Sequence, residues 1–113
     1  AALPAGEDAD TASSVFSLRG LEVDLGKRKV SVDGHRVRLT PIEYRLLALL
    51  VRHAGKVLTH RFLLQSAWGP GSVNDTHSLR VFMATLRRKL EADPAEPKYL
   101  LTEVGVGYRL LDE

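Results

Sequence analysis

Apolar and polar side chains alternate along residues 16–39. The apolar members of this pattern are Phe16 and Leu18, then Leu21, Val23 and Leu25, then Val30 and Val32, then Val37 and Leu39. Because successive side chains of a strand point to opposite faces of a sheet, this spacing predicts short strands with one buried face. Asp33-Gly34 lies between two of the runs, and Asp-Gly supplies the positive backbone angles of a tight hairpin turn. The segment therefore predicts a four-stranded antiparallel sheet.

After residue 39 the spacing becomes helical. Thr40-Pro41-Ile42-Glu43 is a strong helix start, with Thr as the N-cap, Pro in the first turn and Glu three residues after the cap. A second helix is expected to begin near Thr59 and to end at Gly69-Pro70-Gly71. A third is expected over about 75–91, where one apolar stripe recurs at helical spacing. The residues of that stripe are Leu79, Met83, Leu86 and Leu90.

The C-terminal part predicts a hairpin. Two short strands, Tyr99–Val104 and Tyr108–Leu111, flank Gly105-Val106-Gly107, and Asp93-Pro94 closes the preceding helix. The expected order is four strands, three helices and a hairpin, which is an α+β fold.

Composition limits what the chain can be. The 113 residues are enough for one domain with one core, and no apolar run is long enough to cross a bilayer. Residues 1–14 are rich in Ala and acids, so we expect a flexible linker or tail there, and a folded domain over 15–113. The absence of cysteine excludes disulfides and thiol ligands, and it is compatible with the cytoplasm.

Charge is distributed unevenly along the chain. Residues 1–14 hold three acids and no Lys or Arg, so residues 15–113 carry a formal net charge of +5. Residues 76–90, within the third predicted helix, contain Arg80, Arg87, Arg88 and Lys89 and no acid. Such a helix suits the major groove of DNA, where Arg pairs with guanine and small side chains permit close approach. A solvated helix face with cations at its C-terminal end is the plainer alternative.

Two helices followed by a glycine-tipped hairpin fit a helix-turn-helix with a β-ribbon wing. Enzyme interpretations fit less well. Asp75, His77 and Ser78 lie too close together on one helix start to converge as a triad, and Asp75 is expected to cap that helix. The histidines have no zinc-ligand spacing, and no phosphate-binding glycine motif is present, so neither metal nor cofactor is expected.

Four motifs resemble one known family. They are Leu39-Thr40-Pro41-x-Glu43-Tyr44-x-Leu46-Leu47, Trp68-Gly69, Leu86-Arg87-x-Lys89-Leu90 and Gly105-x-Gly107-Tyr108-Arg109. Residues 15–113 are similar through them to the OmpR/PhoB-type winged-helix effector domains of bacterial response regulators. Within that family the segment from Leu79 to Pro94 and the hairpin most resemble KdpE-type regulators, which control potassium-uptake genes.

The resemblance implies a winged helix-turn-helix with a recognition helix over 76–91 and a wing over 99–111. The residues it would turn toward bases are Arg80, Val81, Ala84 and Thr85. The residues it would turn toward phosphates are Trp68, His77, Phe82, Arg87, Arg88, Thr102 and Tyr108. The loop it would turn toward RNA polymerase is Gly69, Pro70, Gly71, Ser72, Val73 and Asn74. Val104 occupies a wing position that is often basic in the family.

The partners implied are double-stranded DNA with a direct-repeat operator, RNA polymerase, an upstream receiver domain and a sensor kinase. Dimers would form on DNA, in the cytoplasm, and the domain would not be an enzyme. A protein-interaction module using residues 69–75 is an alternative. An RNA-binding module is another, although the scattered aromatics do not form a stacking platform.

Overall fold

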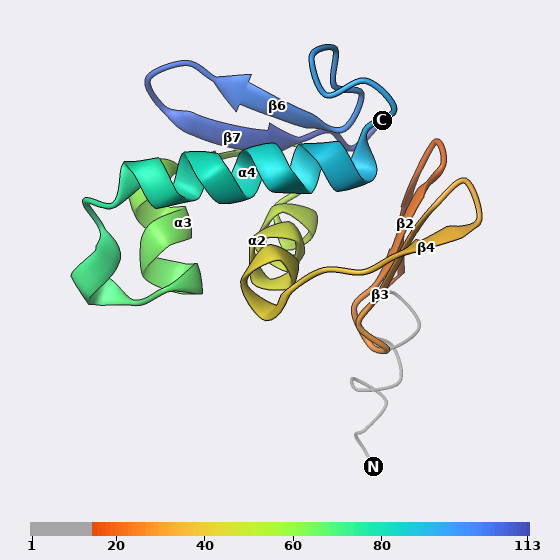
Figure 1. Cartoon of the computed structure of the whole chain (residues 1–113), viewed down its shortest axis with the longest axis horizontal. Coiled ribbons are helices and arrows are strands. Elements are labelled where there is room, and N and C mark those ends of the chain that lie inside the picture. Colours follow the sequence, from red (N-terminus) through yellow and green to blue (C-terminus); the bar gives the residue numbers. More distant parts are fainter. Residues whose placement is uncertain (1–14) are drawn as a thin grey trace. The chain divides into compact units, whose positions relative to one another are not determined.

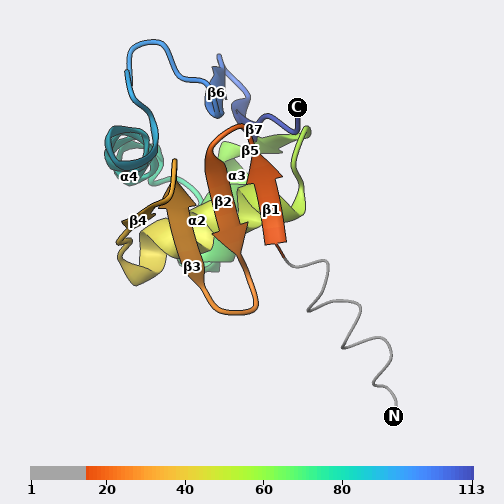
Figure 2. The same cartoon turned by 90° about the vertical axis from the view of Figure 1, so that its right-hand side faces the viewer.

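The computed structural model describes residues 15–113, and the predicted linker over 1–14 lies outside the described residues. The chain divides into two compact units, with the boundary between Arg38 and Leu39. The first contains the strands β1 (Val15–Leu18), β2 (Leu21–Asp24), β3 (Lys29–Val32) and β4 (His35–Val37). They are antiparallel and lie in the order β1-β2-β3-β4, as the alternation predicted (Figure 2).

This sheet has one apolar and one charged face. Leu21, Val23 and Val30 are at most 3% exposed. The charged side chains occupy the alternate positions, where the register places Asp24 opposite Lys29 and Ser31 between Glu22 and Arg36. Opposite charges that face each other across neighbouring strands stabilise this pairing. A slip of one residue in the register would also turn the apolar side chains of a strand to the charged face, so the two-faced pattern specifies the register.

The turn between β3 and β4 confirms the Asp-Gly prediction. Asp33 and Gly34 have φ angles of 51° and 83°, the positive pair that a two-residue hairpin turn of this kind requires. The pattern was wrong about Leu25, because β2 ends at Asp24 and Leu25 lies half-buried in the following turn.

The second unit contains three α-helices, a short 3-10 helix and a three-stranded sheet. Its helices are α2 (Pro41–Arg52), α3 (His60–Ala67), η1 (Pro70–Ser72) and α4 (Thr76–Leu90). Its strands are β5 (Val57–Thr59), β6 (Leu100–Glu103) and β7 (Gly107–Leu110). The strand order is β5-β7-β6, and Figure 1 shows the β6–β7 hairpin running alongside α4.

A side-chain hydrogen bond caps the N-terminus of each of the three α-helices. The Thr40 hydroxyl accepts a hydrogen bond from the Glu43 amide, and the Glu43 carboxylate accepts one from the Thr40 amide at 2.9 Å, which is the predicted capping box. Thr59 caps α3 through the Phe62 amide, at 3.0 Å. Asp75 caps α4 through the Ser78 amide at 3.2 Å, which confirms its prediction as a cap.

Helix α4 is oriented by its apolar stripe. Leu79, Met83 and Leu86 are fully buried, and Leu90 is 1% exposed. Burying each such side chain contributes about 1.5–3 kcal/mol, so a rotation of α4 that exposed the stripe would cost more than any surface contact could return. The opposite face of the helix is therefore committed to solvent or to a partner.

Strand β5 was not predicted. Val57–Thr59 is only three residues long, too short for an alternating pattern to show, and it pairs with Arg109, Tyr108 and Gly107 of β7. The pairing requires Gly107, because an added Cβ there would lie 1.8 Å from the Leu58 carbonyl oxygen. Strand β6 is shorter than the predicted Tyr99–Val104, whereas β7 has the predicted length but begins and ends one residue before Tyr108–Leu111.

Candidate nucleic-acid interface

The solvent face of α4 presents three of the four residues predicted to face bases. Arg80 and Ala84 are exposed, and Val81 is 49% exposed, a high fraction for an apolar residue in the middle of a helix. Arg88, one turn beyond Ala84, is exposed as well. Because residues 76–90 contain no acid, this face combines cations with small and apolar side chains.

Thr85, the fourth predicted base contact, is half-buried and its hydroxyl is engaged within the helix. The hydroxyl donates a hydrogen bond to the Val81 carbonyl at 3.1 Å and accepts one from the Arg88 guanidinium at 3.0 Å. The single hydrogen of the Thr85 hydroxyl is therefore already used within the helix. Reading a base through the hydroxyl would require these bonds to be exchanged.

Three of the residues predicted to face phosphates form one cluster between α4 and the hairpin. Arg87 Nε donates to the Leu100 carbonyl at 3.1 Å, and Arg87 Nη2 donates to the Thr102 hydroxyl at 2.6 Å. The Arg87 guanidinium carbon lies 5.6 Å from the centre of the Tyr108 ring, which is a cation–π distance. Arg87 is half-buried, whereas Thr102 remains exposed.

Tyr108 is placed as a supporting residue more than as an exposed contact, since it is 4% exposed. Its ring also meets the His60 ring edge-on at 5.6 Å. Burial raises the pKa of the Tyr108 hydroxyl, and the positive charges of Arg87 and Arg80 oppose that rise without cancelling it. The phenol therefore stays neutral at ordinary pH.

The remaining aromatic candidates lie at the end of α3 and in the N-terminal half of α4. Trp68 at the end of α3 and Phe82 of α4 are both half-buried, and their rings meet edge-on at 5.3 Å. This contact fixes the end of α3 against α4. His77 is exposed in the first turn of α4.

Lys89 does not contribute to the cationic surface in the way its place in the sequence suggests. Its Nζ lies 2.6 Å from Glu43 Oε1, and the Glu43 side chain is 4% exposed. Burial would raise the pKa of Glu43, but the hydrogen bonds from Lys89 and Thr40 outweigh it and hold that pKa below its ordinary value. This ion pair joins α2 to the end of α4.

Glu91 is a structural residue that sequence reasoning missed. It is 6% exposed, and its carboxylate accepts hydrogen bonds from the amides of Lys98, Tyr99 and Leu100 at 2.7–2.9 Å. The residue thus ties the end of α4 to the start of β6. Spacing gave no signal for it, because the connection crosses an irregular segment.

The loop between α3 and α4 contains η1. Gly69 has a φ of 128°, and Pro70, Gly71 and Asn74 are exposed, while Ser72 and Val73 are half-buried. The hairpin tip is exposed too, with Val104 at 90% and Val106 at 50%. Backbone bonds from Val106 to Glu103 and from His60 to Val106 hold that tip in place.

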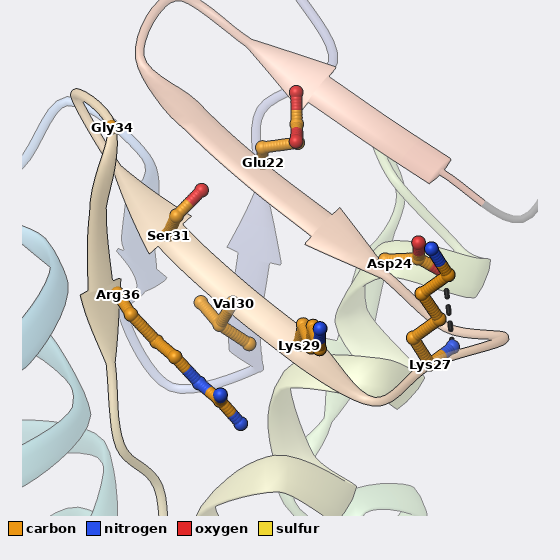
Figure 3. Close-up of a pocket in the computed structure, with 8 residues that line it drawn as sticks. All are labelled: Glu22, Asp24, Lys27, Lys29, Val30, Ser31, Gly34 and Arg36. Carbon is orange, nitrogen blue, oxygen red and sulfur yellow. Dashed lines mark hydrogen bonds between the residues drawn. The ribbon is translucent and has the colours of Figure 1, made fainter.

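A hollow of about 300 Å³ lies in the first unit (Figure 3). Its charged lining residues are Glu22, Asp24, Lys27, Lys29 and Arg36. Because acidic and basic side chains are mixed there, this hollow is a weaker candidate than α4 for binding a polyanion. Among residues 15–113 no group of three or more His, Asp or Glu side chains is placed to hold a metal ion, and no helix is long and apolar enough to span a membrane.

Comparison with known proteins shows the family to which the chain belongs. Residues 34–110 match the family model described as "Transcriptional regulatory protein, C terminal". The chain is 53% identical over 89 residues to the KDP operon transcriptional regulatory protein KdpE of Escherichia coli, covering 79% of this chain and 40% of that protein. It is 48% identical over 101 residues to KdpE of Mycobacterium tuberculosis, covering 89% and 45%. The chain thus spans less than half the length of these relatives.

Solved structures share the fold. The DNA-binding domain of RstA from Klebsiella pneumoniae, in complex with the RstA box, matches with a TM-score of 0.77 at 28% identity, over 88% of this chain and 98% of that one. DrrB of Thermotoga maritima, described as an OmpR/PhoB homolog, matches with a TM-score of 0.74 at 29% identity, over 87% and 44%. The chain belongs to the family of C-terminal domains of transcriptional regulatory proteins and has the winged-helix fold of the OmpR/PhoB type.

Proposed function

We propose that this chain binds double-stranded DNA in a sequence-specific manner and thereby controls transcription. Helix α4 lies in the major groove, and the β6–β7 hairpin lies beside the backbone as a wing. The observation that carries this proposal is the exposed face of Arg80, Val81 and Ala84, directly opposite a fully buried stripe. The match to an RstA domain solved with its DNA box supports it.

The exposed face divides into two kinds of contact. Arg80 is exposed, and within residues 15–113 its side chain has no hydrogen-bonded partner, so it is free to pair with guanine. Val81 and Ala84 suit the methyl group of thymine. Arg88, together with His77, Trp68, Phe82 and Thr102, is proposed to meet phosphates, which position the domain without reading sequence. Thr85 contributes its methyl group to base contact.

The test begins by selecting bound sequences from a random duplex pool. Fluorescence anisotropy then compares the selected duplex with a random duplex of equal length for Arg80→Ala, Arg88→Ala and the control Arg36→Ala on the first unit's sheet. Arg80→Ala should reduce the preference for the selected site by about 1–3 kcal/mol. Arg88→Ala should weaken both duplexes alike and lower the salt slope by about 0.9, since one phosphate contact is lost.

Two outcomes would refute the proposal at different levels. Equal loss on both duplexes for Arg80→Ala and Arg88→Ala would overturn the division between base and phosphate contacts. Failure of the wild-type chain to retain any duplex from the pool would overturn DNA binding itself.

The wider setting extends the same proposal. We infer that the chain is the effector part of a longer two-component response regulator of the KdpE type, acting on potassium-uptake genes in the cytoplasm. The identity to two KdpE proteins supports this. A receiver domain, a sensor kinase, direct-repeat operators and dimers on DNA belong to that setting. The exposure of Pro70, Gly71 and Asn74 supports a contact of the 69–74 loop with RNA polymerase. In this proposal the domain acts by binding and not by catalysis.

A further inference from the structure

The guanidinium of Arg87 joins three separate parts of the second unit. It sits on α4, donates to the backbone of β6 at Leu100 and to the side chain of Thr102, and lies over the Tyr108 ring of β7. Arg88, the next residue along, donates a hydrogen bond to Thr85 within its own helix. Two adjacent arginines with the same charge therefore have different surroundings.

The hydrogen atoms around this cluster can be counted. Arg87 Nε and one N–H of Nη2 are used by Leu100 and Thr102, and the Thr102 oxygen acts as the acceptor in the second bond. A hydroxyl that accepts still has its own hydrogen to donate. Because Thr102 is exposed, that hydrogen is available to an acceptor outside the protein, and phosphate oxygens are strong acceptors.

We propose that Arg87 is a positioning residue, which fixes the wing against α4 and orients the Thr102 hydroxyl as a donor to a DNA phosphate. This inference rests on the proposed function for its DNA partner. It differs from treating Arg87 as an independent electrostatic contact, because the geometry of the guanidinium matters as much as its charge. Tyr108 provides the buried ring on which the guanidinium rests, so it acts through Arg87.

The variants Arg87→Lys and Arg88→Lys form a matched pair, since both retain the charge at neighbouring positions. A lysine at 87 has one nitrogen and cannot reproduce the planar fork that reaches Leu100 and Thr102 while stacking on Tyr108. Thr102→Val removes the hydroxyl at constant shape, and Thr102→Ser retains it. Binding of a selected duplex is measured by anisotropy from 50 to 300 mM KCl, on about ten concentrations per variant.

Arg87→Lys should weaken binding about tenfold, and by more than Arg88→Lys, with the salt slope unchanged because the charge remains. Thr102→Val should weaken binding by a similar factor, and Thr102→Ser should weaken it by less than about twofold. The double variant Arg87→Lys/Thr102→Val should weaken binding by no more than the larger of the two single losses, because both changes remove the same contact. If Arg87→Lys binds as well as Arg88→Lys, or if the two losses multiply, the proposal is overturned.

Measurements without DNA separate this inference from the proposed function. In amide NMR spectra of the free chain, Arg87→Lys should shift the signals of residues 100–108 and speed their hydrogen exchange, while Arg88→Lys should leave them in place. Unchanged wing signals would overturn the positioning role. Absence of duplex binding by the wild-type chain, with the wing signals shifted as expected, would overturn DNA binding and the donor role of Thr102 but not the restraint on the wing. If Arg87→Lys fails to fold, Thr102→Val carries the same test through the Arg87 Nη2 hydrogen signals, because Nη2 is the group that donates to Thr102.

Discussion

The ion pair between Glu43 and Lys89 gives the sharpest prediction about stability. The Glu43 carboxylate is buried, with its side chain 4% exposed, and it accepts hydrogen bonds from the Thr40 amide at 2.9 Å and from Lys89 Nζ at 2.6 Å. One carboxylate therefore completes the cap of α2 and anchors the last turn of α4. Glu43→Ala removes both contacts.

The expected loss can be worked from these two contacts. The cap contributes about 1 kcal/mol, and a hydrogen bond between charged groups contributes about 1.5–3 kcal/mol when both are buried. Because the Lys89 side chain is 33% exposed, we take about 1 kcal/mol for the second contact. The free energy of unfolding should fall by about 2 kcal/mol for Glu43→Ala, which lowers Tm by about 10 °C for a domain of this size. Glu43→Gln keeps an acceptor for Thr40 and should lose about half as much.

The assay is urea unfolding followed by circular dichroism, with a double-mutant cycle of Glu43→Gln and Lys89→Met. The single variant Lys89→Met leaves a buried carboxylate without its cation, so the double variant should be about 1 kcal/mol more stable than the sum of the single losses predicts. Additive losses would refute the coupling.

The same pair predicts a dependence on pH. Because the folded pKa of Glu43 lies below its unfolded value, the carboxylate stabilises the fold above the unfolded pKa. This contribution is lost as pH falls through the folded pKa, so the advantage of wild type over Glu43→Gln should hold at pH 6 and shrink below about pH 4.3. An advantage that stayed constant from pH 6 to pH 3 would contradict the lowered pKa.

Two further predictions concern the hairpin. Gly107→Ala should lower the free energy of unfolding by at least about 2 kcal/mol, because the added Cβ would overlap the Leu58 carbonyl. Gly71→Ala is the control: it has open space around it and should change the free energy of unfolding by less than about 0.5 kcal/mol. Thermal unfolding of both variants checks the prediction, and equal losses would contradict it. Val104→Arg should strengthen binding to all duplexes, because the wing tip, where Val104 is 90% exposed, would gain one phosphate or minor-groove contact. The salt slope of duplex binding should rise by about 0.9. An unchanged slope would place the tip away from DNA.

Much of the fold could be predicted because local signals agreed with the long-range packing. Thr40, Asp75 and the Asp33-Gly34 turn act through neighbours within three residues, so their roles can be read from sequence. Strand β5 could not be found, because three residues carry no period and its partner in β7 lies about fifty residues away along the chain. The close approach that requires Gly107 exists only after that pairing is made.

The sequence predicted which face of α4 is exposed, but it did not predict the side-chain contacts within the candidate site. The buried stripe of α4 determines which face is exposed, so Arg80, Val81 and Ala84 follow from helical spacing alone. The partners of Arg87 and Thr85 depend on side-chain distances that spacing does not encode. The buried Tyr108 shows the same limit, since a strand pattern indicates a face but not what lies on top of it.

Counting cations along α4 overstates the surface that could meet DNA. Of its four cationic residues, Lys89 is paired with Glu43 and Arg87 is held by the hairpin, which leaves Arg80 and Arg88 on the exposed face. The paired cations lie toward the C-terminal end of the helix, where they join α4 to α2 and to the wing. Charge in this segment therefore has two uses, and the salt slope of binding should reflect Arg80, Arg88 and their neighbours but not Lys89. A slope that fell by a full contact for Lys89→Met would show that the ion pair opens on DNA.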